Sequence, residues 1–261
     1  MDQQYPIYHW ANDDNPVSAL EKTAQLRTTP CNILEWEMFT SLVPASLSGQ
    51  NLLDYGCGVG ELSLLCARRG ATVLGVDRSE AVIQTARHQA KVNLMNLMDM
   101  DRCRFEVHTE MPVVGRYDLI VAKDVIEHIR DDDMWLASVA AILKPQGLLI
   151  LSTQNNRCLN YLIEATYHRW WQGDKSWMGW DPTHVRFYNA SSLSRLLTRH
   201  GFTVEKWASI WIIPYNIMSW LTLLKCDVTL PSLGHFDRWF GKMPPFNRLG
   251  WCLMAVCTRN K

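Results

Sequence analysis

The sequence predicts an α/β fold in which helices cover both faces of a doubly wound, mostly parallel sheet. Two observations carry this prediction. Between residues 51 and 152, apolar strands alternate with helical segments, and these strands are apolar along their whole length, as parallel strands buried on both faces are. A glycine-rich turn at 56–60 directly follows the first strand, at the place where such sheets bind their ligands.

The elements are expected in a regular order along the chain. Strands are expected at 51–55, 72–76, 103–107, 118–122 and 147–152, with helices at 60–69, 79–93 and 131–143 between them. Another helix at 189–200, a strand at 202–207 and a last strand at 250–258 follow. Ser79 is expected to cap the second helix, since its hydroxyl can accept a hydrogen bond from a first-turn amide. Gly201 suits the left-handed residue that ends the helix at 189–200.

With 261 residues, the chain is expected to form a single domain. We expect residues 1–50 to form an N-terminal helical lid, 51–153 a cofactor-binding core, and 154–261 the segments that determine the substrate together with the last strands. Two aromatic-rich insertions, at 154–186 and 208–247, follow the fifth and sixth strands. A ligand at the carboxyl ends of the strands needs such covering segments, because they exclude water.

Charge and cysteine content exclude several classes of protein. The 26 basic residues balance the 26 acidic ones and form no run, so we expect no nucleic-acid partner, which would need a basic surface. The eight Cys are scattered without a C-x-x-C pair, which favours buried free thiols and a cytoplasmic location. Residues 1–6 are polar and acidic, unlike a signal peptide. No feature indicates an obligate protein partner.

The segment 207–224 is uncharged and largely apolar. Pro214, Asn216 and several hydroxyl side chains make it a poor membrane span, which requires about 20 apolar residues. We interpret it as a strand followed by a buried or cleft-lining helix. The alternative is a surface that touches lipid or a lipid-like substrate, and therefore a peripheral contact with a membrane.

The glycine turn and the second strand indicate a cofactor that contains a nucleoside. Gly56 and Gly58 can adopt positive φ and Gly60 allows close packing, so bare backbone is open to a ligand. Asp77 ends the second strand, where an acid can bind both ribose hydroxyls. The spacing is G-x-G-x-G after Asp54, not the dinucleotide spacing G-x-G-x-x-G. A carboxylate disfavours a pyrophosphate but suits S-adenosylmethionine, which has an amino group and no phosphate.

Four stretches of the chain resemble the class I S-adenosylmethionine-dependent methyltransferases, and within them the branch of the ubiquinone-biosynthesis O-methyltransferases and related small-molecule enzymes. They are LDYGCGVG at 53–60, GVD at 75–77, YDLIVAKDVIEH at 117–128 and LKPQG at 143–147. Their order and spacing agree over 51–152, and DPTHVRFY at 181–188 is a weaker fifth match. Residues 1–50 and 208–247 carry no part of the resemblance.

The resemblance implies a Rossmann-like, seven-stranded sheet whose last strand is antiparallel. It also implies that the three glycines shape the methionine pocket, that Asp54 helps to hold the amino group and that Asp77 binds the ribose. Family members place an acid after the third strand to meet the adenine amino group, and this chain departs there. Glu110 is the expected substitute, with Met111 packing on the adenine, and the alternative is that Glu110 is a solvated loop acid. The expected cofactor-binding set is completed by Cys57, Arg78 and Lys123.

A histidine after the fourth strand is the first candidate for the chemistry. Methyl transfer is an in-line displacement at a sulfonium, so catalysis requires positioning and removal of a proton from an oxygen or nitrogen. His128 suits the base role, because an unperturbed imidazole has a pKa of about 6.5.

The same histidine is also a candidate metal ligand. Asp124, Glu127 and His128 stand at i, i+3 and i+4 and would share one face of a helical turn. There they could bind a divalent cation that anchors a phenolate or catechol. The resembled quinone methyltransferases carry a similar E-x-x-E-H run, in which a divalent metal is implicated, and Asp124 replaces its first Glu. Metal binding, a base or substrate contact by His128, and a loop-stabilising role all stay open, and a metal is not expected to be essential.

His184 lies in the first aromatic insertion, beside Arg186. It is a second catalytic candidate through direct contact with the substrate, and the alternative is a histidine that orders its loop. Two groups of aromatic residues are expected to line a pocket for a flat or greasy substrate, or to stabilise a cation, although core or lid packing is the alternative for any one of them. They are Tyr161, Tyr167, Trp170, Trp171, Trp177 and Trp180, followed by Trp207, Trp211, Tyr215 and Trp220.

These features favour an S-adenosylmethionine-dependent methyltransferase that acts on a hydrophobic small molecule. The leading expectation is O-methylation of an aromatic or prenylated acceptor. Alternatives are C-methylation of an isoprenoid alkene such as a prenyl diphosphate, through a carbocation held by aromatic side chains, and N-methylation of a small amine. A cofactor-binding protein without catalysis stays open, whereas a dehydrogenase would need the spacing G-x-G-x-x-G and no acid at position 54.

Overall fold

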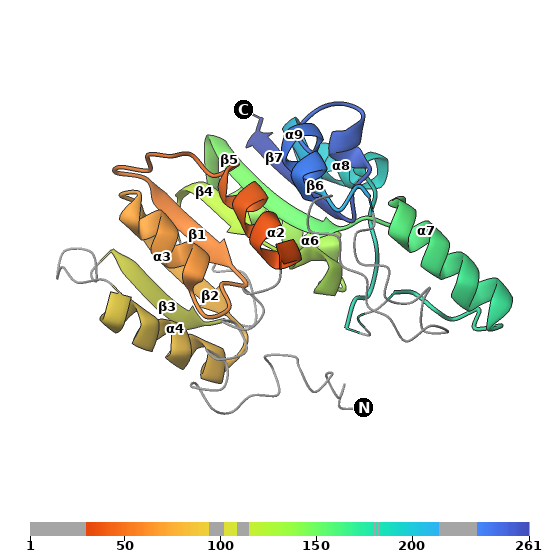
Figure 1. Cartoon of the computed structure of the whole chain (residues 1–261). Helices are drawn as coiled ribbons and strands as arrows, with labels where there is room; N and C mark the ends of the chain where they lie inside the picture. The colour runs from red at the N-terminus through yellow and green to blue at the C-terminus, as the bar shows by residue number, and fades with distance from the viewer. Residues whose placement is uncertain are drawn as a thin grey trace.

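The computed structural model describes residues 30–93, 102–108, 115–179, 181, 183–213 and 234–260. Within this part of the chain, seven strands form one sheet in the order β3-β2-β1-β4-β5-β7-β6 (Figure 1). Their bounds are β1 Asn51–Tyr55, β2 Thr72–Asp77, β3 Cys103–Val107, β4 Tyr117–Ala122, β5 Leu143–Gln154, β6 Phe202–Ile210 and β7 Cys252–Arg259. The predicted α/β fold is confirmed.

The order and direction of the strands put a switch point at the centre of the sheet. Strands β1 to β5 are parallel, with β1 between β2 and β4, whereas β7 runs antiparallel to both β5 and β6. The antiparallel last strand implied by the resemblance is therefore confirmed. Because the chain moves outward from β1 in both directions, the loops after β1 and β4 diverge at the carboxyl ends of the strands, where open α/β sheets bind ligands.

Helices cover both faces of the sheet and bury two apolar cores. They are α2 Pro30–Thr40, α3 Glu61–Arg68, α4 Glu80–Asn93, α6 Asp132–Ile142 and α8 Ala190–Arg199. Alternate strand residues point to opposite faces, so Leu52 belongs to the core with α2, α3 and α4, and Leu53 to the core with α6 and α8. Figure 1 shows α2 and α3 on the same face. Burial on both faces explains why the strands are apolar without alternation.

Side-chain caps define the helix ends near the site. Asp131 caps α6 by accepting a hydrogen bond from a first-turn amide at 2.8 Å, and Asn189 forms a capping box with Ser192 at the start of α8. Ser79 is confirmed as a cap of α4, because its Oγ accepts a first-turn amide at 3.4 Å. Gly201 follows α8 with the predicted left-handed φ of 77°.

Two strands are longer than predicted by three residues or more. β5 begins at Leu143 instead of 147, directly after α6, because Leu143 pairs with Tyr117 of β4 beyond a register shift. β6 continues to Ile210 instead of 207, because Ala208 and Ile210 pair with β7 and bury their side chains. Pairing across the sheet thus extends strands that the local pattern would end earlier.

The lid and insertion segments contribute helices around the sheet. The first insertion forms α7 Leu159–Thr166, which continues into a π-helical turn, η3 Tyr167–Trp171, and extends away from the sheet in Figure 1. The second contains α9 Gly234–Phe240, which packs beside α2 of the expected lid. Among the described helices, none combines the length and apolar character that crossing a bilayer requires. Residues 1–29, and 214–224 of the apolar segment, lie outside the described part of the chain.

Gly75 of β2 is expected not to tolerate a side chain. A Cβ there would lie 2.7 Å from Phe105 Cδ1 and 2.9 Å from Ser63 Oγ. Gly75→Ala should therefore overpack the core and lower the free energy of unfolding by about 1–3 kcal/mol, measured by urea denaturation. The double substitution Gly75→Ala and Phe105→Leu should lower the free energy of unfolding by less than the sum of the two single effects, because the smaller side chain relieves the overlap. Strict additivity would contradict this account.

Candidate functional site

The glycine loop between β1 and α3 folds tightly against the end of β2. Gly56 N and Cys57 N both donate to Val76 O, at 2.8 and 2.9 Å, and the three loop glycines have φ values of 74, 53 and 85°. A Cβ on Gly56 would lie 2.5 Å from Val125 Cγ2, whereas a Cβ on Gly58 would meet no described atom within 4 Å beyond its chain neighbours. Gly58 therefore presents bare backbone on the open side of the loop.

The carboxylate of Asp77, at the end of β2, lies beside this open backbone. Its Oδ2 accepts a hydrogen bond from Gly58 N at 3.1 Å, and its Oδ1 accepts one from Ser79 N at 3.0 Å. Asp77 is half-buried at the end of β2, and its contact with a ribose stays a prediction. Arg78 follows as an exposed residue. Burial and then the nearby charge of Arg78 lower the pKa of His128, which relates this end of the site to the candidate base.

Two predicted cofactor-binding side chains turn inward instead. Asp54 is buried beneath the loop, and its Oδ2 accepts a hydrogen bond from Ser63 Oγ of α3 at 2.6 Å. Burial raises the pKa of this carboxyl to about 7. Its contact with a cofactor amino group stays a prediction. The Cys57 thiol packs in the apolar core, so only the backbone of this residue is available on the ligand side of the loop.

Lys123 is engaged by two carboxylates. Its ammonium forms ion pairs with Glu35 of α2 and with Asp124. Burial lowers the pKa of Lys123, but the two negative charges outweigh burial and raise this pKa above its ordinary value. The ion pairs tie the expected lid helix to the end of β4. Any contact of Lys123 with a cofactor would be made by an ammonium that is already paired with Glu35 and Asp124. The predicted Glu110 and Met111 lie within 109–114, outside the described residues.

The helical turn that would place Asp124, Glu127 and His128 on one face does not form. Asp124 has a φ of 55°, and only Ile126–His128 form a 3-10 turn, η2. The Asp124 carboxylate accepts a hydrogen bond from Ser152 Oγ at 2.6 Å and pairs with the lysine beside it. Asp124 thus belongs to the ion-pair cluster with α2 and does not share a helical face with Glu127 and His128, while its part in a metal site stays a prediction.

Glu127 and His128 meet His184 instead. The candidate ligand atoms of these three residues all lie within 4.8 Å of one another, and the two imidazole centroids are 4.6 Å apart. Glu127 is fully buried, and neither of its carboxylate oxygens has a hydrogen-bond partner among the described residues. Burial, followed by the charge of Asp124, raises the pKa of Glu127 to about 8. A buried, unpartnered carboxyl beside two imidazoles fits a divalent cation, which would satisfy it.

His128 also contacts Thr183, and through it Asp181, neither of which the sequence pattern singles out. Its Nδ1 lies 3.0 Å from Thr183 Oγ1, and this hydroxyl donates to Asp181 Oδ1 at 2.6 Å. Burial lowers the pKa of His128 below its ordinary value, so the imidazole is neutral at pH 7 and can accept a proton. The only signal in the sequence is that Thr183 and Asp181 belong to the weakly matched stretch DPTHVRFY.

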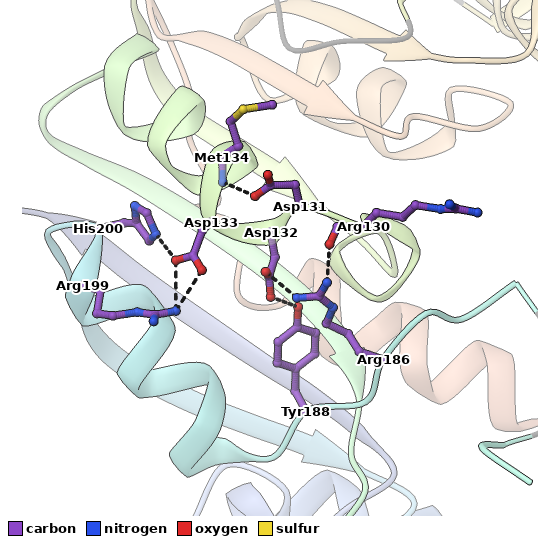
Figure 2. A network of polar contacts seen from close by, with 9 residues as sticks. All are labelled: Arg130, Asp131, Asp132, Asp133, Met134, Arg186, Tyr188, Arg199 and His200. Carbon is purple, nitrogen blue, oxygen red and sulfur yellow. Dashed lines mark hydrogen bonds and ion pairs between the residues drawn. The ribbon is translucent and has the colours of Figure 1, made fainter. Parts of the chain in front are cut away.

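A network at the start of α6 holds the segment 183–188 in place, as Figure 2 shows. Asp132 is buried, accepts a hydrogen bond from the Tyr188 hydroxyl at 2.7 Å and forms an ion pair with Arg186. Arg186 also donates to the carbonyl oxygen of Arg130. Arg186, the sequence neighbour of the candidate His184, is therefore an anchor of this segment.

Backbone contacts bring the same segment over η2. Val185 N donates to Glu127 O at 2.9 Å, and Tyr188 forms a parallel bridge with Asn155, directly after β5. His184 is buried as a result. The structure thus brings both predicted catalytic histidines together, although they come from different loops.

The predicted aromatic groups divide between the interior and the surface. Trp170 and Trp171 end η3 with 87% and 85% of their surface exposed, and Trp170 borders an open surface pocket together with Tyr161 and Leu162. Trp177 stacks on His168 with ring centroids 4.8 Å apart. Of the other members, Tyr161, Tyr167, Trp207 and Trp211 are at least partly buried, whereas Trp180, Tyr215 and Trp220 lie outside the described residues.

The comparison with protein families identifies this arrangement. A family model described as a methyltransferase domain matches residues 32–206. The ubiquinone biosynthesis O-methyltransferase of Nitrobacter winogradskyi is 33% identical over 176 residues, which are 65% of this chain and 63% of the relative. The mitochondrial ubiquinone biosynthesis O-methyltransferase of Bos taurus is 28% identical over 174 residues, which are 65% and 46%. The match thus spans less than two thirds of each relative's length.

Solved structures agree with the fold. The magnesium protoporphyrin IX methyltransferase of Synechocystis PCC 6803, with bound S-adenosylhomocysteine, has a TM-score of 0.62 at 16% identity, over 93% of this chain and 95% of that one. The [4+2]-cyclase SpnF has a TM-score of 0.57 at 16% identity, over 86% and 80%. Since one of these neighbours is a cyclase, the fold alone does not define the reaction.

The sheet order, the open backbone at Gly58 and the carboxylate of Asp77 define a class I α/β protein that binds a nucleoside-containing cofactor. The family match is more specific: the chain belongs to the methyltransferase domain family, and thus to the S-adenosylmethionine-dependent methyltransferases. The site fits this cofactor, because the glycine loop offers bare backbone and Asp77, the predicted ribose ligand, lies beside it.

Asp54 is expected to make stability depend on pH. Because burial raises its pKa from 3.8 to about 7, the folded protein holds this proton more tightly than the unfolded chain does. The free energy of unfolding should therefore fall between pH 4 and 7, by about 1.4 kcal/mol per unit of pKa shift. Asp54→Asn keeps an acceptor for Ser63 but cannot ionise, so it should be more stable than wild type at pH 8 and lose this advantage at pH 5. Urea denaturation measures the difference, and an equal gap at both pH values would contradict the prediction.

Proposed function

We propose that this chain transfers a methyl group from S-adenosylmethionine to an oxygen atom of a hydrophobic small molecule, an aromatic or prenylated acceptor. The observation that carries the proposal is the half-buried imidazole of His128, in the turn that follows β4, with its Nδ1 3.0 Å from Thr183 Oγ1. Relatives named as O-methyltransferases support oxygen as the accepting atom.

The turn that carries the candidate base packs against the glycine loop through Val125. Val125, three residues before His128, fills the space beside Gly56. Arg78, next to the predicted ribose ligand Asp77, is close enough to His128 that its charge adds to burial in lowering the pKa of the imidazole. An acceptor bound at His128 would therefore lie beside the methyl donor.

The cofactor, when bound, supplies a methyl group that its sulfonium has already activated. The residues of this chain then have two tasks, to hold the acceptor in line and to accept its proton. His128 can accept the proton because burial keeps it neutral at pH 7. The carboxylate of Asp181, which reaches His128 through Thr183, would stabilise the imidazolium that forms.

A divalent cation offers a second route to the same reaction. Glu127, His128 and His184 would hold the cation, which would lower the pKa of a bound phenol or catechol hydroxyl. The buried, unpartnered carboxyl of Glu127 supports this route. We retain the sequence-based expectation that the metal is not essential, because His128 can act as a base without it.

Exposed apolar side chains support a greasy acceptor. They lie on and after α7 and are Leu159, Leu162, Trp170, Trp171 and Met178. Side chains of this kind favour a peripheral contact with a lipid surface, from which a prenylated acceptor could be taken up. The exposure of Trp170 and Trp171 also argues against C-methylation, because a carbocation would need aromatic faces enclosed around it.

Asp77→Ala should weaken the binding of S-adenosylhomocysteine about tenfold or more, because the ribose loses a charged acceptor of hydrogen bonds. Isothermal titration calorimetry measures the affinity. Asp133→Ala, which removes an exposed carboxylate on α6, should leave the affinity unchanged. Tight binding of NAD without binding of S-adenosylhomocysteine would refute the assignment.

His128→Ala should lower kcat by about a hundredfold, because the acceptor loses its base. The assay uses labelled S-adenosylmethionine with a panel of prenylated catechols and phenols, and mass spectrometry identifies the O-methylated products. The double substitution Trp170→Ala and Trp171→Ala should affect KM more than kcat.

The same assay separates the alternatives. A larger loss of kcat from the tryptophan substitutions than from His128→Ala would favour C-methylation. EDTA should leave turnover largely unchanged. Loss of activity in EDTA, with recovery on adding Mg²⁺ or Zn²⁺, would instead make the cluster of Glu127, His128 and His184 an essential metal centre.

A further inference from the structure

We propose that Thr183 and Asp181 are positioning residues that fix the tautomer of His128, so that Nδ1 carries the proton and Nε2 accepts one from the methyl acceptor. The inference rests on the proposed function, because it concerns the same histidine in its role as base. It assigns a function to two residues of the aromatic insertion.

The direction of the hydrogen bonds follows from the single proton of the Thr183 hydroxyl. Oγ1 lies 2.6 Å from Asp181 Oδ1, and an ionised carboxylate oxygen can only accept. Thr183 therefore donates its proton to Asp181. Toward His128 Nδ1, at 3.0 Å, the same oxygen can then act only as an acceptor. Nδ1 must consequently be the protonated nitrogen, and the lone pair of the neutral ring lies on Nε2.

The geometry fixes Asp181 Oδ1 as an acceptor. This oxygen accepts the backbone N–H of Thr183 at 2.8 Å as well as the Thr183 hydroxyl at 2.6 Å. The second oxygen, Oδ2, lies 3.6 Å from His184 Nε2. One carboxylate thus faces both histidines of the site.

The hydrogen bond between Thr183 and His128 is a long-range tertiary contact and not part of a local turn. The two residues are 55 positions apart, and Thr183 is only 7% exposed. The segment that carries Thr183 is anchored independently, by Val185 on Glu127 and by the hydroxyl of Tyr188 on Asp132. Loss of the threonine hydroxyl should therefore leave the segment in place and change the state of His128.

The tautomer decides whether the proton can be transferred. As the acceptor oxygen forms its bond to the methyl group, its O–H bond breaks and the proton passes to Nε2 of His128. The opposite tautomer would present an N–H to the acceptor and could not accept this proton. Coordination of a cation through Nε2 would need the same lone pair, so the hydrogen-bond chain suits either route.

Thr183→Val and Thr183→Ser form a matched pair, because the first removes the hydroxyl with little change of shape and the second retains it. With labelled S-adenosylmethionine and a prenylated catechol, Thr183→Val should lower kcat about tenfold to a hundredfold and leave the affinity for S-adenosylhomocysteine unchanged. Thr183→Ser should keep most of the wild-type kcat, and Asp181→Asn should resemble Thr183→Val. Thermal melting verifies that each variant is folded.

Nitrogen-15 NMR of the imidazoles at pH 8 gives a readout that does not depend on turnover. The signals of His128 are assigned by their loss in His128→Gln. Wild type and Thr183→Ser should show a protonated Nδ1 and an unprotonated Nε2, whereas Thr183→Val should show a mixture of the two tautomers.

The outcomes separate this inference from the proposed function. An inactive His128→Ala together with a fully active Thr183→Val, or a protonated Nε2 in the wild type, would overturn the inference and leave the base role of His128 standing. Full activity of His128→Ala would refute the base role itself, and the positioning role with it.

Discussion

The geometry of the site depends on the hydrogen bond and the ion pair that the buried carboxylate of Asp132 forms. This carboxylate accepts a hydrogen bond from Tyr188 and pairs with Arg186, both from the segment after β5 (Figure 2). Burial raises the pKa of Asp132, but these two partners outweigh burial and keep the carboxyl charged. A charge taken out of water stays favourable only while it is paired. The pairing therefore fixes the segment that carries Thr183 and His184 over η2.

Two other acids at the start of α6 also fix the surrounding structure, because each contacts a different part of the chain. Asp131 caps the helix, and Asp133 pairs with Arg199 and His200 at the end of α8 (Figure 2). Acids in the first turn are also favoured by the helix dipole. The beginning of one helix thus fixes the segment that bears the site and the helix that follows this segment.

Two buried polar clusters at the carboxyl edge differ in how fully they are satisfied. Lys123 is paired with Glu35 and Asp124, and this ion-pair cluster fastens α2 to the sheet. Glu127, beside the two histidines, has a buried carboxyl without a hydrogen-bond partner among the described residues. Buried polar groups are normally satisfied, and an exception with a shifted pKa is typical of a functional site. The first cluster therefore stabilises the fold, whereas the second is the one for which we propose a functional role.

The sequence by itself determined the fold class and the cofactor side of the site. The glycine loop and Asp77 are short-range features, because a strand, a turn and the start of a helix lie within a few residues and each position has a strict steric or chemical requirement. Spacing alone predicted a helical turn at Asp124 that does not form: its backbone is left-handed, and it pairs with Lys123, which also pairs with Glu35 of a helix some 90 positions earlier in the chain.

Only the tertiary structure decided the acceptor side. Thr183 and His184 reach His128 across more than 50 positions through strand pairing and the buried charge of Asp132. Such contacts leave no periodic signal in the sequence, because they depend on where two residues lie in space and not on how far apart they are along the chain. The same reason explains why Trp170 and Trp171, which the composition suggested for a pocket, lie on the surface. Local chemistry encodes the predicted site of the methyl donor, and long-range packing encodes the surroundings of the candidate base His128.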